Sequence, residues 1–212
     1  MPVFFQHQES NCRLLLWNAA EEEAFFSEDL VGVLTDGSPA HPEKRKQYLA
    51  GRFLLRQLDP HFPLDRIHRT PKGRPYLPDT RSHFSLSHAG SYIAAILNDT
   101  EKVGIDVERI NDRAHRIRTK FLSAKEEGIL LGCRDDSQGP SANHLYTMAW
   151  SVKEAAFKAL HQTGVDFIRD LPIEQIDVVE GGWSIKIGGK GMGLYVRAMI
   201  FEPICLAWAV QE

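Results

Sequence analysis

The sequence has few cysteines and no long apolar run. These two absences argue against a disulfide-rich protein, a cysteine zinc site and a membrane-spanning helix. Its three cysteines, Cys12, Cys133 and Cys205, lie far apart, so neither a disulfide framework nor zinc-ligand spacing is present, and we expect reduced thiols. No apolar stretch approaches the roughly 20 residues that a membrane-spanning helix needs. The first residues, 1–7, lack the regions of a signal peptide. We therefore expect a cytoplasmic protein without a membrane partner.

The sequence also lacks a large excess of charge of either sign. Its formal net charge is -3 over 212 residues, so no global basic field favours nucleic acid, and we expect no nucleic-acid partner. Local basic clusters, such as residues 113–120, can still hold a polyanion. With 43% hydrophobic residues, the chain can bury the core of one domain or of two small halves.

Hydrophobic periodicity gives the order of the elements. Near the start it predicts strands at 3–6 and 13–17, a helix that ends near Asp29, and a helix from Pro42 to about Leu58. Period-two segments predict an antiparallel meander at 83–87, 92–97 and 102–108. Two helices follow, at 113–131 and 143–160, separated by a surface loop at 134–140. The last predicted strands are 176–179, 183–187, 194–201 and 205–210.

This order predicts an α+β fold. Residues 1–101 and 102–212 each combine helix with antiparallel strands, so we expect two pseudo-symmetric halves, each an antiparallel sheet packed with helix. A cleft between two such halves would suit a ligand, and we expect the active site there.

Two carboxylates stand side by side in the strand at 102–108. Strand alternation puts Ile105 and Val107 on one face of the strand. It puts Asp106 and Glu108 together on the other face. Like charges at that spacing repel each other unless a proton or a cation lies between them, and paired carboxylates with phosphate oxygens are typical of a magnesium site. The alternative is a solvent-facing strand surface, where acidic pairs are common.

The helix at 143–160 carries a polar stripe. Helical spacing aligns Trp150, Glu154 and Lys158 on one side, so Glu154 can supply a third metal ligand. The alternative is an ordinary surface pair of Glu154 with Lys158, worth about 0.3–0.5 kcal/mol.

Ser87 and His88 end a strand in a small-residue turn where an anion can approach. A hydrolase nucleophile and base are disfavoured there, because adjacent strand residues point to opposite faces and the Gly-x-Ser-x-Gly elbow is missing.

Basic residues in the first half can grip phosphates. Arg45 and Arg52 share one side of the long helix, and Lys72 and Arg74 lie in a compact turn before the meander. A solvated helix face and an ordinary turn are the alternatives for these residues.

Four segments in order resemble the successive motifs of the 4'-phosphopantetheinyl transferase superfamily. They are Gly73-Arg74-Pro75, Phe84-Ser85-Leu86-Ser87-His88, Gly104-Ile105-Asp106-Val107-Glu108 and Trp150-Ser151-Val152-Lys153-Glu154-Ala155-Ala156-Phe157-Lys158. Phe121-Leu122-Ser123 with Glu126 is similar to a weaker feature of the family. The resemblance covers about residues 45–160, and the chain length resembles the two-half, monomeric branch.

The resemblance implies a fold, an activity and partners. We expect the family's two-half fold and a magnesium-dependent enzyme that transfers 4'-phosphopantetheine from coenzyme A to a serine of an apo acyl or peptidyl carrier protein. The other product would be 3',5'-ADP. We expect a monomer whose N-terminal half, 1–101, contacts the coenzyme A phosphates and adenine, and whose C-terminal half, 102–212, carries the metal ligands and the catalytic helix.

The resemblance also implies roles for single residues. Asp106, Glu108 and Glu154 resemble the magnesium ligands, and Lys158 resembles the lysine that contacts the coenzyme A diphosphate. The remaining positions resemble coenzyme A contacts: Ser87, His88, Arg74, Arg52 and, more loosely, Arg45 and Lys72. Arg74 replaces the lysine often found in its motif, which keeps the charge and changes the donor geometry.

These roles lead to a mechanism and leave two rivals. Glu154, directly or through a metal-bound water, is the expected base for the carrier serine, with Asp106 as a further catalytic residue and Lys158 stabilising the leaving group. A phosphohydrolase would use the same carboxylates with water as nucleophile. A non-catalytic module would bind coenzyme A or a carrier protein and leave it intact. The basic residues Arg113, Arg116, Arg118 and Lys120 are a candidate docking face for an acidic carrier protein, or else a solvated helix side.

Overall fold

The computed structural model describes residues 3–28, 30, 38–133, 139–189 and 193–211. The chain forms two compact units, Met1–Glu101 and Lys102–Glu212. Each unit has its own antiparallel sheet, its own helices and its own cluster of buried apolar side chains. The expected α+β class, with two antiparallel sheets packed with helices, is therefore confirmed, whereas the expected cleft stays a prediction. None of the described helices is long and apolar enough to cross a membrane.

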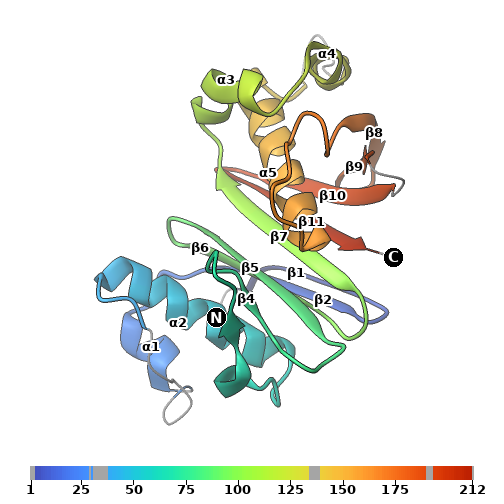
Figure 1. Ribbon diagram of the computed structural model, residues 1–212. Coiled ribbons are helices and arrows are strands. Elements are labelled where there is room, and N and C mark those ends of the chain that lie inside the picture. The colour runs from blue at the N-terminus through green and yellow to red at the C-terminus, as the bar shows by residue number, and fades with distance from the viewer. Residues whose placement is uncertain (1–2, 29, 31–37, 134–138, 190–192, 212) are drawn as a thin grey trace. The chain divides into compact units, whose positions relative to one another are not determined.

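The first unit is built on a four-stranded sheet with the order β1-β2-β6-β5. Helix α2 lies against this sheet, mainly on β6, and α1 packs beside α2 (Figure 1). A two-stranded ribbon and one turn of 3-10 helix, Leu64–Arg66, complete the unit. The element bounds are β1 Val3–Glu9, β2 Cys12–Asn18, α1 Glu23–Glu28, α2 Pro42–Leu58, β3 His68–Arg69, β4 Pro75–Tyr76, β5 His83–Ala89 and β6 Tyr92–Asn98.

Helix α2 anchors the core of the first unit. It begins at Pro42, whose fixed φ and missing N–H suit the first turn of a helix. Its apolar side buries Leu49, Phe53 and Leu54. The ring of Phe53 meets that of Trp17 on β2 edge to face, with centroids 5.6 Å apart. The expected bounds of this helix, Pro42 to about Leu58, agree with the structure.

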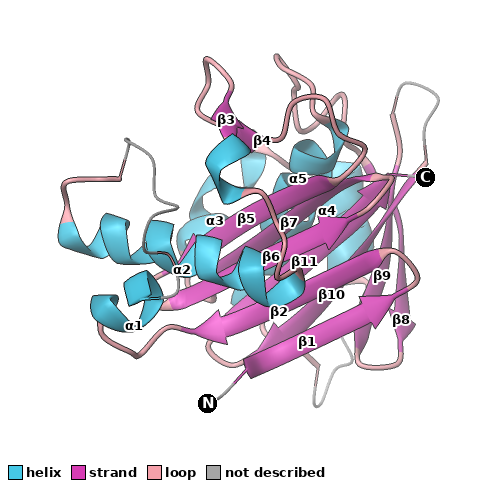
Figure 2. Ribbon diagram, turned by 90° about the horizontal axis from the view of Figure 1, so that it is seen from below, coloured by secondary structure: helices cyan, strands magenta, loops and turns pink. Residues whose placement is uncertain are grey.

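The second unit is built on a five-stranded sheet with the order β7-β11-β10-β9-β8, and the long helix α5 lies across one face of it (Figures 1 and 2). Helices α3 and α4 pack beside α5. The element bounds are β7 Lys102–Arg109, α3 Arg113–Ile117, a 3-10 turn Arg118–Lys120, α4 Ala124–Leu131, α5 Ala142–Leu160, β8 Ile173–Val179, β9 Gly182–Ile187, β10 Leu194–Phe201 and β11 Ile204–Gln211.

One glycine allows α5 to lie close to β7. A Cβ atom on Gly104 would stand 2.0 Å from the carbonyl oxygen of Ala155 and 2.6 Å from the backbone nitrogen of Ala159. These are backbone atoms, so no side chain can move aside to make room. The small residues Ala155 and Ala159 of α5 lie at this contact and are fully buried.

The predicted meander is wrong in its third strand. β5 and β6 form the expected hairpin, but β7 pairs with β11 in the sheet of the second unit. The physical reason is that β6 already pairs with β2 on one edge and with β5 on the other, so it has no free edge for β7. The carboxamide oxygen of Asn98 accepts hydrogen bonds from the backbone N–H groups of Thr100 and Glu101, which turns the chain out of the first sheet.

The single helix predicted at 113–131 is also wrong, because the chain forms α3, a 3-10 turn and α4 there. Ser123 starts α4 afresh through a capping box, in which its hydroxyl accepts from the N–H of Glu126 and the Glu126 carboxylate accepts from the N–H of Ser123. Two other expectations fall partly outside the described residues: the helix end near Asp29 and most of the loop at 134–140.

Candidate active site

Strand β7 presents Asp106 to helix α5. The carboxylate is buried, with 4% of the residue exposed. The Lys158 ammonium group donates a hydrogen bond of 2.8 Å to Asp106 Oδ1 and another of 2.8 Å to the carbonyl oxygen of Ile105. Lys158 of α5 is therefore hydrogen-bonded to β7. Its partner there is Asp106, the first of the three predicted metal ligands.

Glu108 lies two residues further along the same side of β7, and it also contacts α5. The indole N–H of Trp150 donates to Glu108 Oε1 over 3.1 Å. Burial raises the pKa of the Glu108 carboxyl and the charge of Asp106 raises it further, whereas the hydrogen bond from Trp150 works in the opposite direction.

Glu154 lies on α5 one turn after Trp150 and one turn before Lys158. Burial raises the pKa of Glu154, and the charges of Asp106 and Glu108 also raise it, whereas that of Lys158 lowers it. The three predicted metal ligands and Lys158 thus lie within electrostatic reach of one another in the second unit.

The three carboxylates fit magnesium by donor type, because hard carboxylate oxygens in a partly buried setting are the ligands that this ion takes. A cation would also offset the repulsion that raises the pKa values of Glu108 and Glu154. Their side chains do not form a complete set, since no group of three or more His, Cys, Asp or Glu residues in the described ranges is placed to hold a metal as it stands. The assignment of Asp106, Glu108 and Glu154 as ligands therefore stays a prediction.

In the first unit, Arg52 is buried in α2, with 7% of the residue exposed. Its guanidinium carbon lies 3.3 Å from the centre of the Tyr48 ring, and its Nη1 donates to the Tyr48 carbonyl oxygen. Burial lowers the pKa of Arg52 to about 10, and the charge of Arg69 on β3 contributes to this. A buried arginine near a second arginine is an arrangement that a phosphate group would stabilise.

The other predicted phosphate contacts of the first unit lie on α2, on the β3–β4 turn and at the end of β5. Arg45 donates from Nε to Glu23 Oε1 over 2.8 Å, so its charge is already paired. Lys72 is exposed and Arg74 half-buried, and burial lowers the pKa of Arg74. Their contacts with a phosphate stay predictions.

Ser87 and His88 occupy the end of β5, opposite Ala94 and Ile93 of β6, so their side chains point to opposite faces of the strand. A pocket of about 150 Å³ lies beside the turn that follows β5. It is lined by Ala19, Glu43, Lys46, Gln47, Gly90, Ser91 and Ile93.

The amino-acid sequence around this site is similar to that of a known protein family. A model of the 4'-phosphopantetheinyl transferase superfamily matches residues 102–196, which include all four polar residues on β7 and α5 described above. The chain belongs to the 4'-phosphopantetheinyl transferase superfamily.

Individual relatives agree with this membership. The chain is 28% identical to 4'-phosphopantetheinyl transferase Sfp of Bacillus subtilis, over 77% of this chain and 72% of that protein. It is 31% identical to a putative 4'-phosphopantetheinyl transferase of Haemophilus influenzae, over 65% of this chain and 60% of that protein. It is 33% identical to 4'-phosphopantetheinyl transferase AcpT of Escherichia coli O157:H7, over 59% of this chain and 62% of that protein. The family and the enzyme class predicted from the motifs are confirmed.

The sequence analysis missed what Lys153 does in this transferase. Lys153 is fully buried in the middle of the last motif and forms an ion pair with Glu126 of α4. Its ammonium group also donates to the carbonyl oxygens of Phe121 and Phe167. Glu126 accepts a further hydrogen bond of 2.9 Å from the N–H of Ile173 on β8. The pair thus joins α5, α4 and β8, and Lys153 is structural.

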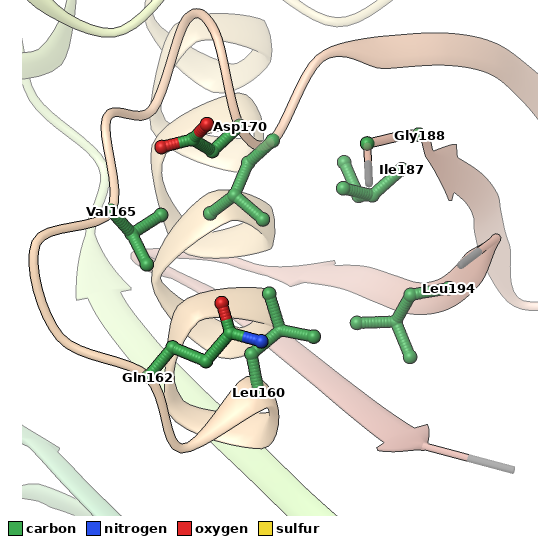
Figure 3. A pocket seen from close by; sticks show the side chains of 9 residues that line it. Leu160, Gln162, Val165, Asp170, Ile187, Gly188 and Leu194 are labelled. Atoms are coloured by element: carbon green, nitrogen blue, oxygen red, sulfur yellow. The ribbon is translucent and has the colours of Figure 1, made fainter. Parts of the chain in front are cut away.

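A second pocket of the transferase lies at the C-terminal end of α5 and is mostly apolar (Figure 3). Its apolar lining comes from the side chains of Leu160, Val165, Ile187 and Leu194, and Gln162 lies at its edge. None of the predicted site residues lines this pocket, so it is not the place where the motifs direct coenzyme A.

Proposed function

We propose that this transferase uses magnesium held by Asp106, Glu108 and Glu154 to move 4'-phosphopantetheine from coenzyme A to a serine of an apo acyl or peptidyl carrier protein. One observation carries the proposal. Lys158 is hydrogen-bonded to Asp106, and the charges of the three carboxylates and Lys158 act on one another, within the segment that matches the family. When bound, the ion would neutralise charge on the diphosphate as the phosphoanhydride bond breaks.

The chain's own residues would do the rest. Glu154 would accept the proton of the serine hydroxyl as its oxygen forms a bond to the phosphorus atom next to the pantetheine. The bond between that phosphorus atom and the oxygen that bridges the two phosphates would break, and the bridging oxygen would leave with the electron pair as part of 3',5'-ADP. Lys158 would stabilise that leaving group with its positive charge, which now lies 2.8 Å from Asp106.

The first unit would bind the remainder of coenzyme A. Arg52 supports this role because it is buried beside Tyr48 and near the charge of Arg69. We propose that Arg45, Lys72, Arg74, Ser87 and His88 contribute further contacts. The pocket beside the turn after β5 offers about 150 Å³ for part of the nucleotide.

The test of the activity is an incubation of the protein with coenzyme A, magnesium chloride and several apo carrier proteins. Mass spectrometry should show the gain of a phosphopantetheine arm on the carrier and the release of 3',5'-ADP. Release of inorganic phosphate without a modified carrier would favour a phosphohydrolase, and intact coenzyme A with every carrier would contradict the transferase.

The test of the carboxylates is the variant Asp106→Asn, which keeps the size of the side chain and an acceptor for Lys158. We expect transfer to fall on the order of 100-fold or more, because a charged ligand is lost. Asp177→Asn is the matched control, since Asp177 is an exposed aspartate on β8 of the same unit. An unchanged rate for Asp106→Asn would show that the carboxylate pair is structural.

We further propose that the enzyme is monomeric and acts in the cytoplasm, as the sequence features led us to expect. Analytical ultracentrifugation at micromolar concentration should give a single species near the chain mass of 24.0 kDa. A concentration-dependent mass would contradict the monomer.

A further inference from the structure

Helix α5 contacts the two carboxylates of β7 with two different donors. Lys158 carries a positive charge to Asp106 and so neutralises part of that carboxylate. Trp150 brings an uncharged N–H to Glu108, because an indole nitrogen is a donor only. Trp150 therefore adds no positive charge beside Glu108, and it binds one of the two carboxylate oxygens.

The indole ring is itself held in place. Its plane meets the ring of Phe121 edge to face, with centroids 5.2 Å apart, and the ring of Phe167 lies 5.7 Å away on a tilt. Phe121 and Phe167 also supply the two carbonyl oxygens that bind the buried Lys153. The indole ring is therefore packed against the same two residues that bind the buried Lys153.

We propose that Trp150 is a positioning residue, whose N–H orients the Glu108 carboxylate toward the divalent cation. This inference rests on the proposed function, because it needs Glu108 to be a metal ligand. A hydrogen-bonded partner behind a ligand reduces the number of rotamers that the ligand explores, and the loss of such a partner typically weakens metal binding about 10- to 100-fold. The ring of Trp150 would pack equally well without its N–H, so the two roles can be separated.

The experiment measures binding of Mn²⁺, used as the probe ion, by the signal of free Mn²⁺ in electron paramagnetic resonance. Wild-type protein is compared with Trp150→Phe, which keeps an aromatic ring against Phe121 and Phe167 but has no N–H. We expect the apparent Kd for Mn²⁺ to rise about 10-fold. Transfer by the variant should recover at high metal concentration, because the effect is on affinity for the metal and not on the chemical step.

Two further proteins separate positioning from packing. Trp183→Phe, on β9, changes a half-buried tryptophan of the same unit and should leave the Kd unchanged. Replacement of Trp150 by 3-benzothienylalanine exchanges the N–H for sulfur at constant shape, and it should raise the Kd as Trp150→Phe does, even if Trp150→Phe folds poorly.

The outcomes are distinct. If the wild type binds Mn²⁺ and the benzothienyl protein binds it equally tightly, the positioning role of Trp150 is wrong and the metal site stands. If the wild type binds no Mn²⁺ with or without coenzyme A, the metal site fails, and the role of Trp150 fails with it.

Discussion

Lys153 shows how a charged side chain in a functional motif can serve the fold. It is fully buried, as is its partner Glu126, and hydrogen bonds from Ser123 and Ile173 complete the set around that carboxylate. A buried ion pair is expensive to desolvate, but breaking it from one side leaves an uncompensated charge in the interior. The pair therefore stabilises the arrangement of α4, α5 and β8 mainly because any arrangement that separates Lys153 from Glu126 would leave an unpaired charge in the interior.

The first prediction concerns this pair. Lys153→Met should lower the free energy of unfolding by about 3–5 kcal/mol, because it leaves the Glu126 carboxylate buried without its cation. The double variant Lys153→Met/Glu126→Gln should lose less than the single one, since the glutamine is neutral and still accepts hydrogen bonds. Urea denaturation measures both values.

A partly exposed ion pair provides the control for this cycle. Lys186 and Glu174 lie 3.0 Å apart on β9 and β8 with both side chains accessible to solvent. Lys186→Met should change stability far less than Lys153→Met. An equal loss in the two variants would mean that burial of Lys153 contributes nothing.

The second prediction concerns the Cys12 thiol. Burial raises its pKa from the ordinary value of 9.0 to about 11, and the charge of Glu9 adds to this. The folded protein therefore holds this proton up to about pH 11, whereas the unfolded chain releases it near pH 9. Between these values the unfolded state binds fewer protons, so stability falls as the pH rises.

The loss assigned to Cys12 should be on the order of 2–3 kcal/mol across this window, at about 1.4 kcal/mol for each unit of pKa. Unfolding in urea at pH 8, 9, 10 and 11 measures it as the difference between wild type and Cys12→Ala. The same difference for Cys133→Ala should be smaller, because Cys133 is only half-buried. Parallel curves for wild type and Cys12→Ala would contradict the assignment.

At the scale of elements, the contact of α5 with β7 decides whether the site can form. Gly104→Ala should lower the free energy of unfolding by about 1–3 kcal/mol or more, since the added Cβ would overlap backbone atoms of Ala155 and Ala159. We also expect weaker transfer activity, because α5 would move away from Asp106 and take Glu154 and Lys158 with it.

Gly128→Ala is the matched control for that variant. Gly128 is exposed on α4, and a Cβ there would meet no atom within 4 Å. Alanine is the better helix former by about 1 kcal/mol, so this change should be neutral or stabilising. Thermal unfolding and the transfer assay compare the two. Equal stability of the two variants would show that α5 tolerates a shift from β7.

The elements differ in how far the sequence could predict them. The bounds of α2 follow from Pro42 and a clear apolar side, and β6 and β10 follow from their turns. The break between α3 and α4 also had a signal, the capping box formed by Ser123 and Glu126, which the apolar periodicity across it concealed.

Other features had no signal in the sequence, because they depend on partners far away in the chain. Lys153 and Glu126 are 27 residues apart, and Trp150 and Glu108 are 42 apart. The stripe of Trp150, Glu154 and Lys158 was visible from helical spacing, but which strand it would meet was not. The pairing of β7 with β11 also joins positions about a hundred residues apart, so no local pattern could reveal it.

At the scale of the whole molecule, the formal net charge of -3 bears on the choice of partner. An acidic carrier protein would be repelled by the overall charge, so attraction has to come from a local basic face. Of the candidate docking residues, Arg118 is bonded to Glu127 over 2.9 Å, and Arg113 acts on Glu108, where a change would confuse docking with metal binding. Arg116 and Lys120 are exposed, and the 3.4 Å ion pair of Arg116 with Asp112 lies in solvent, so it holds the Arg116 charge only weakly.

The last prediction is that Arg116→Ala/Lys120→Ala raises the KM for an acidic carrier protein several-fold at low ionic strength and leaves kcat unchanged, because these charges act on encounter. The effect should disappear near 0.5 M salt, where charges are screened within about 4 Å. The control Lys186→Ala/Arg197→Ala removes the same charge from β9 and β10 and should leave the KM nearly unchanged. If both double variants raise the KM equally, net charge governs encounter and the segment around α3 is an ordinary solvated surface.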